Sequence, residues 1–80
     1  MGVSPNPSKD IFELNIESSE ADNLRWDLFN VQGMKVQEGR LDVNVGTTHE
    51  MINAKDLPVG IYYLKVHNDD GFETLKLIKM

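Results

Sequence analysis

The chain has 80 residues, with eight Lys and Arg against thirteen Asp and Glu, a formal net charge of −5 and no cysteine. A chain of this length forms at most one domain, and it buries roughly 60–65 % of the surface that it exposes when unfolded. The acidic balance argues against nucleic acid and against an anionic membrane surface as partners. The lack of cysteine excludes disulfides and cysteine-ligated metal sites.

The first part of the chain predicts a turn followed by two strands. Pro5-Asn6-Pro7 is expected to form a rigid opening turn, because proline fixes φ and disfavours helix in the residue before it. Residues 11–16 and 24–29 alternate between apolar and polar side chains, as half-buried strands do, and residues 18–23 read as the loop between them. The side chains expected to face the core are Phe12, Leu14, Ile16, Leu24, Trp26 and Leu28.

The middle of the chain predicts a hairpin followed by shorter strands. Asn30-Val31-Gln32-Gly33 reads as a four-residue turn, with Asn favoured at the first position and Gly at the last. A strand is expected over residues 34–38, ending before Gly39. Further strands are expected over residues 41–45 and 51–54, with Gly46-Thr47-Thr48 between them.

Residues 57–62 have the pattern Leu-x-x-Gly-x-Tyr, which is typical of a chain that turns a corner of a β-sandwich. Gly60 permits backbone conformations that other residues avoid. Tyr62 is then expected to start a strand with its ring in the core and its hydroxyl bonded to upstream backbone. This is the arrangement of the tyrosine corner in immunoglobulin-like sandwiches.

The last part of the chain predicts a second hairpin. Residues 61–66 form the longest β-rich run, Asn68-Asp69-Asp70-Gly71 repeats the turn chemistry, and residues 72–79 form the closing strand. No window shows a sustained helical period. The fold class predicted is therefore all-β, a small immunoglobulin-like antiparallel β-sandwich of about seven strands.

The candidate catalytic and metal-binding residues match no known spacing. His49 and His67 would need to converge with carboxylates such as Glu50 and Asp69 to hold a metal, and solvated histidines are the expected alternative. Asp69-Asp70-Gly71 lacks the register of a calcium loop and suits a hairpin turn. Three carboxylates are candidates for general acid/base chemistry, but nothing near them indicates burial or a partner that would tune their pKa values: Asp42, Glu50 and Asp56. We expect no catalytic site, cofactor or metal.

Aromatic residues offer one further possibility, a platform on which sugars stack. The alternation puts Trp26 and Tyr62 in the core, whereas Phe29 and Tyr63 fall on the opposite face and are the better candidates for exposure. Phe72 belongs to the same candidate set.

Taken together, the motifs resemble the type A C-terminal sorting domain of the type IX (Por) secretion system, from about Pro5 to Met80. The resemblance rests on the order and spacing of the motifs, with Asn30 where the family usually has Asp and Ser4 where it often has an aromatic residue. Val36 follows the first turn, as in the family. The sorting-motif residues carried over are Pro5, Asn6, Pro7, Asn30, Gly33, Leu57, Gly60, Tyr62, Lys76 and Lys79.

The resemblance implies a non-catalytic signal at the C-terminal end of a larger cargo protein. The cargo would cross the inner membrane by a signal peptide, be recognised in the periplasm, pass the outer-membrane translocon, and lose the tail to a surface sortase. The implied partners are the translocon, the sortase and the fused upstream cargo domain, with no nucleic acid or small-molecule substrate. Residues 1–4 are expected to be an expression or linker remnant, and residues 5–80 the sorting domain. The location expected is the periplasm in transit, then the cell surface or medium.

Two alternatives differ in class from a sorting signal. One is a generic immunoglobulin-like accessory or carbohydrate-binding module of a secreted enzyme or adhesin. The other is a small enzyme, for which no nucleophile, metal or acid/base constellation is found. A homodimer formed through an edge strand is also left open, and the terminal strand with Lys76 and Lys79 is the expected recognition surface.

Overall fold

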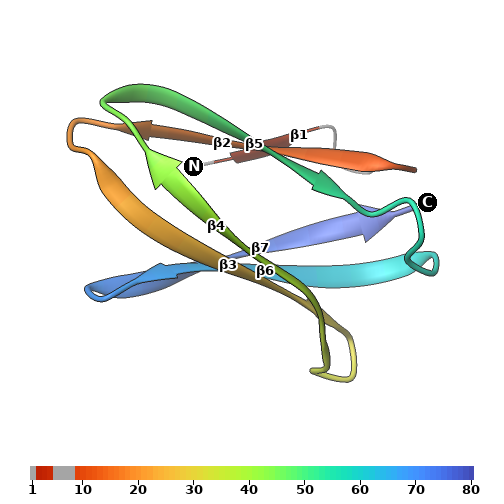
Figure 1. Cartoon of the computed structure of the whole chain (residues 1–80). Helices are drawn as coiled ribbons and strands as arrows, with labels where there is room; N and C mark the ends of the chain where they lie inside the picture. The colour runs from red at the N-terminus through yellow and green to blue at the C-terminus, as the bar shows by residue number, and fades with distance from the viewer. Residues whose placement is uncertain (1, 5–8) are drawn as a thin grey trace.

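The computed structural model describes residues 2–4 and 9–80. Within this part of the chain the regular structure consists of strands, with no helix (Figure 1). The strands are β1 (Gly2–Ser4), β2 (Ile11–Ser18), β3 (Asp22–Asn30), β4 (Lys35–Val43), β5 (Gly46–Asn53), β6 (Gly60–Asn68) and β7 (Gly71–Lys79). The predicted opening turn Pro5-Asn6-Pro7 lies outside the described residues.

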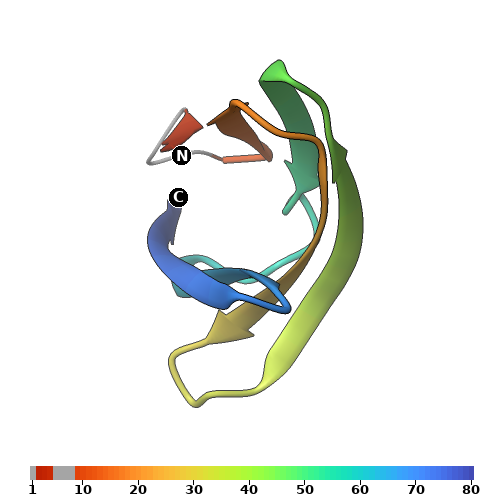
Figure 2. The same ribbon diagram turned by 90° about the vertical axis from the view of Figure 1, so that its left-hand side faces the viewer.

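The strands form two antiparallel sheets, one of order β1-β2-β5 and one of order β4-β3-β6-β7. Viewed end-on, the sheets face each other, with β1 and β2 opposite β6 and β7 (Figure 2). The predicted fold class, an all-β antiparallel sandwich, is confirmed. The closing strand β7 lies at an edge of the four-stranded sheet.

The apolar alternation of the strands builds the core between the two sheets. Successive side chains of a strand point to opposite faces, so one set of each strand is removed from water. Leu24 is half-buried and packs against the core cluster. The buried apolar side chains are Phe12, Leu14, Ile16, Trp26, Leu28, Leu41, Val43, Ile52, Ala54, Tyr62, Leu64, Val66 and Leu77.

The strand boundaries between residues 34 and 54 differ from those predicted. The strand predicted to end before Gly39 continues as β4 to Val43, so residues 41–43 belong to it and not to a separate strand. Strand β5 begins at Gly46, where a break between strands was predicted. Gly39 is opposite Trp26, and a Cβ on Gly39 would come within 2.6 Å of the indole ring. The glycine therefore makes room for a core side chain rather than ending the strand. The loop between β2 and β3 is also shorter than predicted, because β2 extends to Ser18 and β3 starts at Asp22.

Strand β1 is formed by residues that the sequence analysis assigned to a remnant. Its central residue Val3 pairs with Leu14 of β2 and packs against the core. Whatever their origin, residues 2–4 extend the three-stranded sheet. The described residues contain no helix long and apolar enough to cross a membrane.

Candidate functional site

The segment from Leu57 to Tyr62 forms the predicted tyrosine corner. The Tyr62 hydroxyl donates a hydrogen bond of 2.6 Å to the carbonyl oxygen of Pro58, and the ring is 5 % exposed. Gly60 has a φ of +155°, which L side chains rarely adopt, and Leu57 packs against the core. The corner thus fixes the direction in which the chain enters β6.

The turn between β3 and β4 also has the predicted chemistry. The Asn30 side-chain oxygen accepts hydrogen bonds from the backbone N–H groups of Gln32 and Met34, each 3.0 Å long. The N–H of Gly33 donates to the Asn30 carbonyl at 3.0 Å, and Gly33 has a φ of +83°. The side chain of Asn30 therefore supplies the acceptor that stabilises this turn.

The sheet register brings the first turn, the corner and the terminal strand to one end of the four-stranded sheet. Asn30 is paired with Tyr62, which is paired in turn with Leu77. Gly60 is paired with Lys79. Seven of the ten sorting-motif residues thus lie on or beside three adjoining strands at this end, and the remaining three, Pro5, Asn6 and Pro7, lie outside the described residues.

The two terminal lysines have different surroundings. Lys76 is exposed and is opposite Tyr63, whereas Lys79 is only 7 % exposed. Strand alternation puts Lys79 on the same face as Leu77, and its ammonium group lies 3.4 Å from the Met80 carbonyl oxygen. Solvent therefore reaches the side chain of Lys76 but is largely excluded from that of Lys79.

The aromatic residues divide as the alternation predicts. Trp26 and Tyr62 are buried, and the indole N–H of Trp26 has no hydrogen-bond partner among the described residues. Phe29 and Tyr63 are directly opposite each other on β3 and β6; Tyr63 is 40 % exposed and Phe29 is half-buried. Phe72 is 70 % exposed, with the Lys65 ammonium 4.7 Å from its ring centre.

The two histidines lie on different sheets and do not converge. His67 contacts Asp27 at 2.9 Å, and His49 contacts Asn15 and lies 3.3 Å from Glu13. Among residues 2–4 and 9–80, no group of three or more His, Asp or Glu could hold a metal ion.

The carboxylates considered for chemistry lie apart in the fold. Asp42 is on β4, Glu50 is on β5, and Asp56 directly precedes the corner. Asp69 and Asp70 belong to the β6–β7 turn, where the Asn68 side-chain oxygen accepts hydrogen bonds from the N–H groups of Asp70 and Gly71.

One lysine on the outer face of the four-stranded sheet forms two ion pairs. The Lys35 ammonium lies 2.9 Å from Glu38 and 3.5 Å from Asp27. The hydrogen bond to Glu38, followed by the negative charges of Asp27 and Glu38, raises the pKa of Lys35 above its ordinary value. These side chains lie at the surface, where such pairs contribute little to stability.

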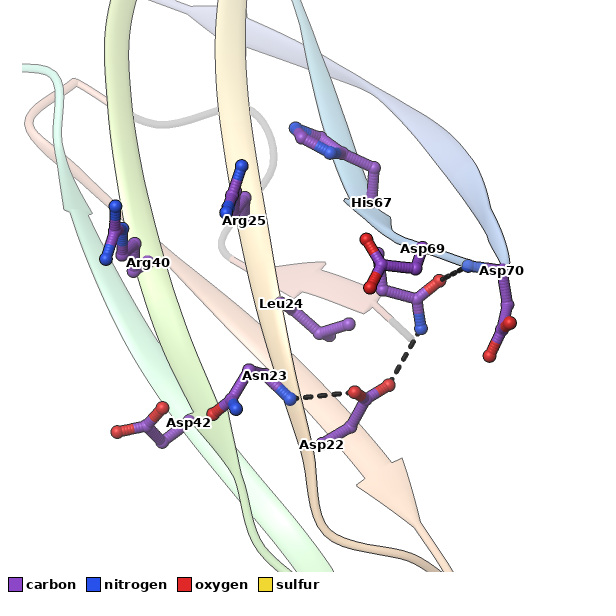
Figure 3. Close-up of a pocket in the computed structure, with 10 residues that line it drawn as sticks. Asp22, Asn23, Leu24, Arg25, Arg40, Asp42, His67, Asp69 and Asp70 are labelled. Carbon is purple, nitrogen blue, oxygen red and sulfur yellow. Dashed lines mark hydrogen bonds between the residues drawn. The ribbon is translucent and has the colours of Figure 1, made fainter.

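A groove that the sequence analysis missed lies at the other end of the four-stranded sheet. It encloses about 690 Å³ and is lined from β3, β4, β6 and the β6–β7 turn (Figure 3). Arg25 and Arg40 are directly opposite each other in its wall, and His67 is opposite Arg25 on the other side. The groove could not be predicted because it depends on the register of β3 against β4, which shifts by one residue between Leu28 and Phe29.

The fold defines a class of protein, the small antiparallel β-sandwich with a tyrosine corner. The residues singled out above build its turns, its corner and its charged outer surface. The family model of the secretion system C-terminal sorting domain matches residues 2–80. The chain therefore belongs to this family, the C-terminal sorting domains of type IX secretion. No curated protein matches the chain. Membership implies an interaction with the type IX secretion machinery and transit to the cell surface or extracellular space.

Proposed function

We propose that this domain is a non-catalytic sorting signal, which directs a larger cargo protein through the type IX outer-membrane translocon to the cell surface. The observation that carries the proposal is the family match over residues 2–80. In this proposal residues 5–80 form the signal, and strand β1 adds residues 2–4 to its three-stranded sheet. The cargo passes the periplasm before export, and a surface sortase then removes the tail.

The proposed roles of the sorting-motif residues separate folding from recognition. Asn30 and Gly33 build the first turn, and Leu57, Gly60 and Tyr62 build the corner. These residues keep the signal folded beside unrelated cargo.

Recognition is assigned to the surface of the terminal strand, where Lys76 is exposed, together with Pro5-Asn6-Pro7. The burial of Lys79 supports a packing role for its alkyl stem. We propose that the domain needs no metal, cofactor, nucleic acid or small-molecule substrate for this role.

The proposal is tested by fusing residues 2–80 behind a periplasmic reporter in a host that has a type IX secretion system. We expect the reporter at the surface or in the medium. The Tyr62→Ala fusion is the matched control, since it should unfold the signal and retain the reporter in the periplasm. A well-expressed wild-type fusion that stays in the periplasm with a folded tail would contradict the proposal.

A second candidate function, carbohydrate binding, is favoured by one observation. Phe29 and Tyr63 lie side by side on the outer face of the sheet, and Tyr63 is 40 % exposed. A glycan array would show binding that Tyr63→Ala abolishes if the candidate is correct. An array without binders would remove this candidate.

A further inference from the structure

A row of four side chains crosses the outer face of the four-stranded sheet. Arg40 of β4 is opposite Arg25 of β3, Arg25 is opposite His67 of β6, and His67 is opposite Phe72 of β7. Directly opposed residues of an antiparallel sheet project from the same face. We call these four residues the arginine–aromatic row. Neighbouring strands lie about 4.8 Å apart, so the row is roughly 14 Å long.

Among residues 2–4 and 9–80, the two arginines of the row find no ionic partner. Within the part of the chain that the structure describes, neither guanidinium group forms a hydrogen bond or lies within ion-pair distance of a carboxylate. Like charges directly opposite each other destabilise a sheet, and the chain has thirteen carboxylate residues from which a partner could have come. By contrast, Lys35 on the same sheet is paired with Asp27 and Glu38. The arginine pair is therefore a concentrated positive charge left available to a ligand.

The groove around the arginine pair contains charges of both signs. Four aspartates share its lining with the arginines: Asp22, Asp42, Asp69 and Asp70. Asp22 accepts a 2.7 Å hydrogen bond from the Asn68 side chain, which joins the start of β3 to the β6–β7 turn (Figure 3). These carboxylates would repel a polyphosphate or a polyanionic glycan. A single peptide carboxylate placed on the arginine pair avoids that repulsion.

We propose that the arginine–aromatic row is a docking site for a short acidic segment of a protein partner in the export pathway. A carboxylate side chain of that segment is held by the guanidinium groups of Arg25 and Arg40, which match carboxylate geometry in two parallel hydrogen bonds. An apolar side chain a few residues further along packs on Phe72, which is 70 % exposed. Arginine and aromatic residues are the types enriched where proteins bind one another.

The length of the row fits such a segment. An extended peptide advances about 3.3 Å per residue, so roughly four residues cross the 14 Å row. This inference rests on the proposed function only for the identity of the pathway. The binding of the peptide depends on the side chains of the arginine–aromatic row alone.

Binding is tested by nuclear magnetic resonance on the labelled domain, with the acetylated and amidated peptide Glu-Ala-Ala-Phe, which carries a single carboxylate, as the probe. We expect shifts of the Arg25 and Arg40 side-chain N–H signals and of the Phe72 ring. Arg25→Gln with Arg40→Gln should weaken binding at least about tenfold, because two charge-assisted hydrogen bonds are lost.

The control is Lys9→Gln with Lys55→Gln, which removes the same charge from exposed sites outside the row. Equal weakening in this control, no shift of the arginine signals, or an equal response to inorganic phosphate would overturn the proposal. Arg25→Lys with Arg40→Lys keeps the charge without the planar fork, and it should bind with intermediate affinity.

The same variants are then placed in the exported reporter fusion. The double Gln variant should melt at or slightly above the wild-type temperature, because the repulsion between the two arginines is removed. It should nevertheless lose most of its export, while the lysine control exports normally. If the wild-type fusion is not exported, the proposed function fails and the peptide titration still decides the docking site. If both the wild type and the double Gln variant are exported equally well, the docking site fails alone.

Discussion

The two sheets of the sandwich share one core but differ in the cationic side chains that they carry. The strands of the three-stranded sheet, β1, β2 and β5, contain no Lys or Arg. The strands of the four-stranded sheet contain six of the eight cationic residues of the chain, and all of these except the buried Lys79 lie outside the core. Both sheets satisfy the same packing demand on their inner faces, so packing cannot explain this difference. The outer face of the four-stranded sheet is therefore the surface on which we expect partners to be distinguished.

The largest effect is expected from Tyr62→Ala, which removes a side chain of the shared core. The variant should lose about 3–5 kcal/mol of unfolding free energy, most of the stability of a domain of this size. Both outer faces should be lost together, as seen by thermal melting followed by circular dichroism. Tyr62→Phe should lose only about 1 kcal/mol, because it removes the hydrogen bond to Pro58 and keeps the ring. Equal losses in the two variants would show that the ring does not hold the core.

Gly39→Ala should have the next largest effect. Its Cβ would lie 2.6 Å from atoms of the buried Trp26 indole, and such overpacking costs about 1–3 kcal/mol. Gly71→Ala is the matched control, because nothing lies within 4 Å of the added methyl group and its φ is not positive. Urea unfolding of both variants measures the difference. A Gly39→Ala domain as stable as the wild type would mean that Trp26 can move away from β4 without cost.

The terminal lysines should separate a packing effect from a surface effect. Lys79→Ala removes a buried alkyl stem from the inner face and should lose about 1 kcal/mol. Lys76→Ala changes an exposed side chain on the outer face and should stay within about 0.5 kcal/mol, yet lower export if that face is recognised. Thermal melting combined with the export assay distinguishes the two. Equal losses of stability would contradict the different burial of these side chains.

The smallest effect concerns the pH dependence of Lys35. Its pKa is raised in the folded state by Glu38 and Asp27, so the ion pairs stabilise the fold fully below the ordinary pKa of 10.5. That contribution disappears as the pH rises through the higher pKa of the folded state. The melting-temperature difference between the wild type and Lys35→Gln should thus be small at pH 7 and vanish at strongly alkaline pH. A difference that grows with pH would have the wrong sign for this account.

The sequence predicted what local chemistry decides. Alternation identified the inner faces of β2, β3 and β6, and the residue types at Asn30–Gly33 and Leu57–Tyr62 identified the turn and the corner. The register of β3 against β4 could not be read in the same way. A one-residue shift between Leu28 and Phe29 determines that Arg25 faces Arg40.

Without that shift Arg25 would face Gly39, and the arginine pair would not form. The burial of Lys79 depends likewise on tertiary packing at the edge of the sheet. One signal in the sequence does indicate the register. The indole of Trp26 leaves no room for a side chain on the residue opposite it, and Gly39 is the residue of β4 that has none.

The central claim, that this domain is an export signal, is tested most directly by comparing reporter export in two hosts. The measured quantity is the fraction of a reporter fused to residues 2–80 that reaches the surface or medium. It is measured in a type IX-competent host and in the same host without its outer-membrane translocon. We predict that most of the reporter is outside the first host and that it stays in the periplasm of the second. Equal fractions in the two hosts would contradict the claim.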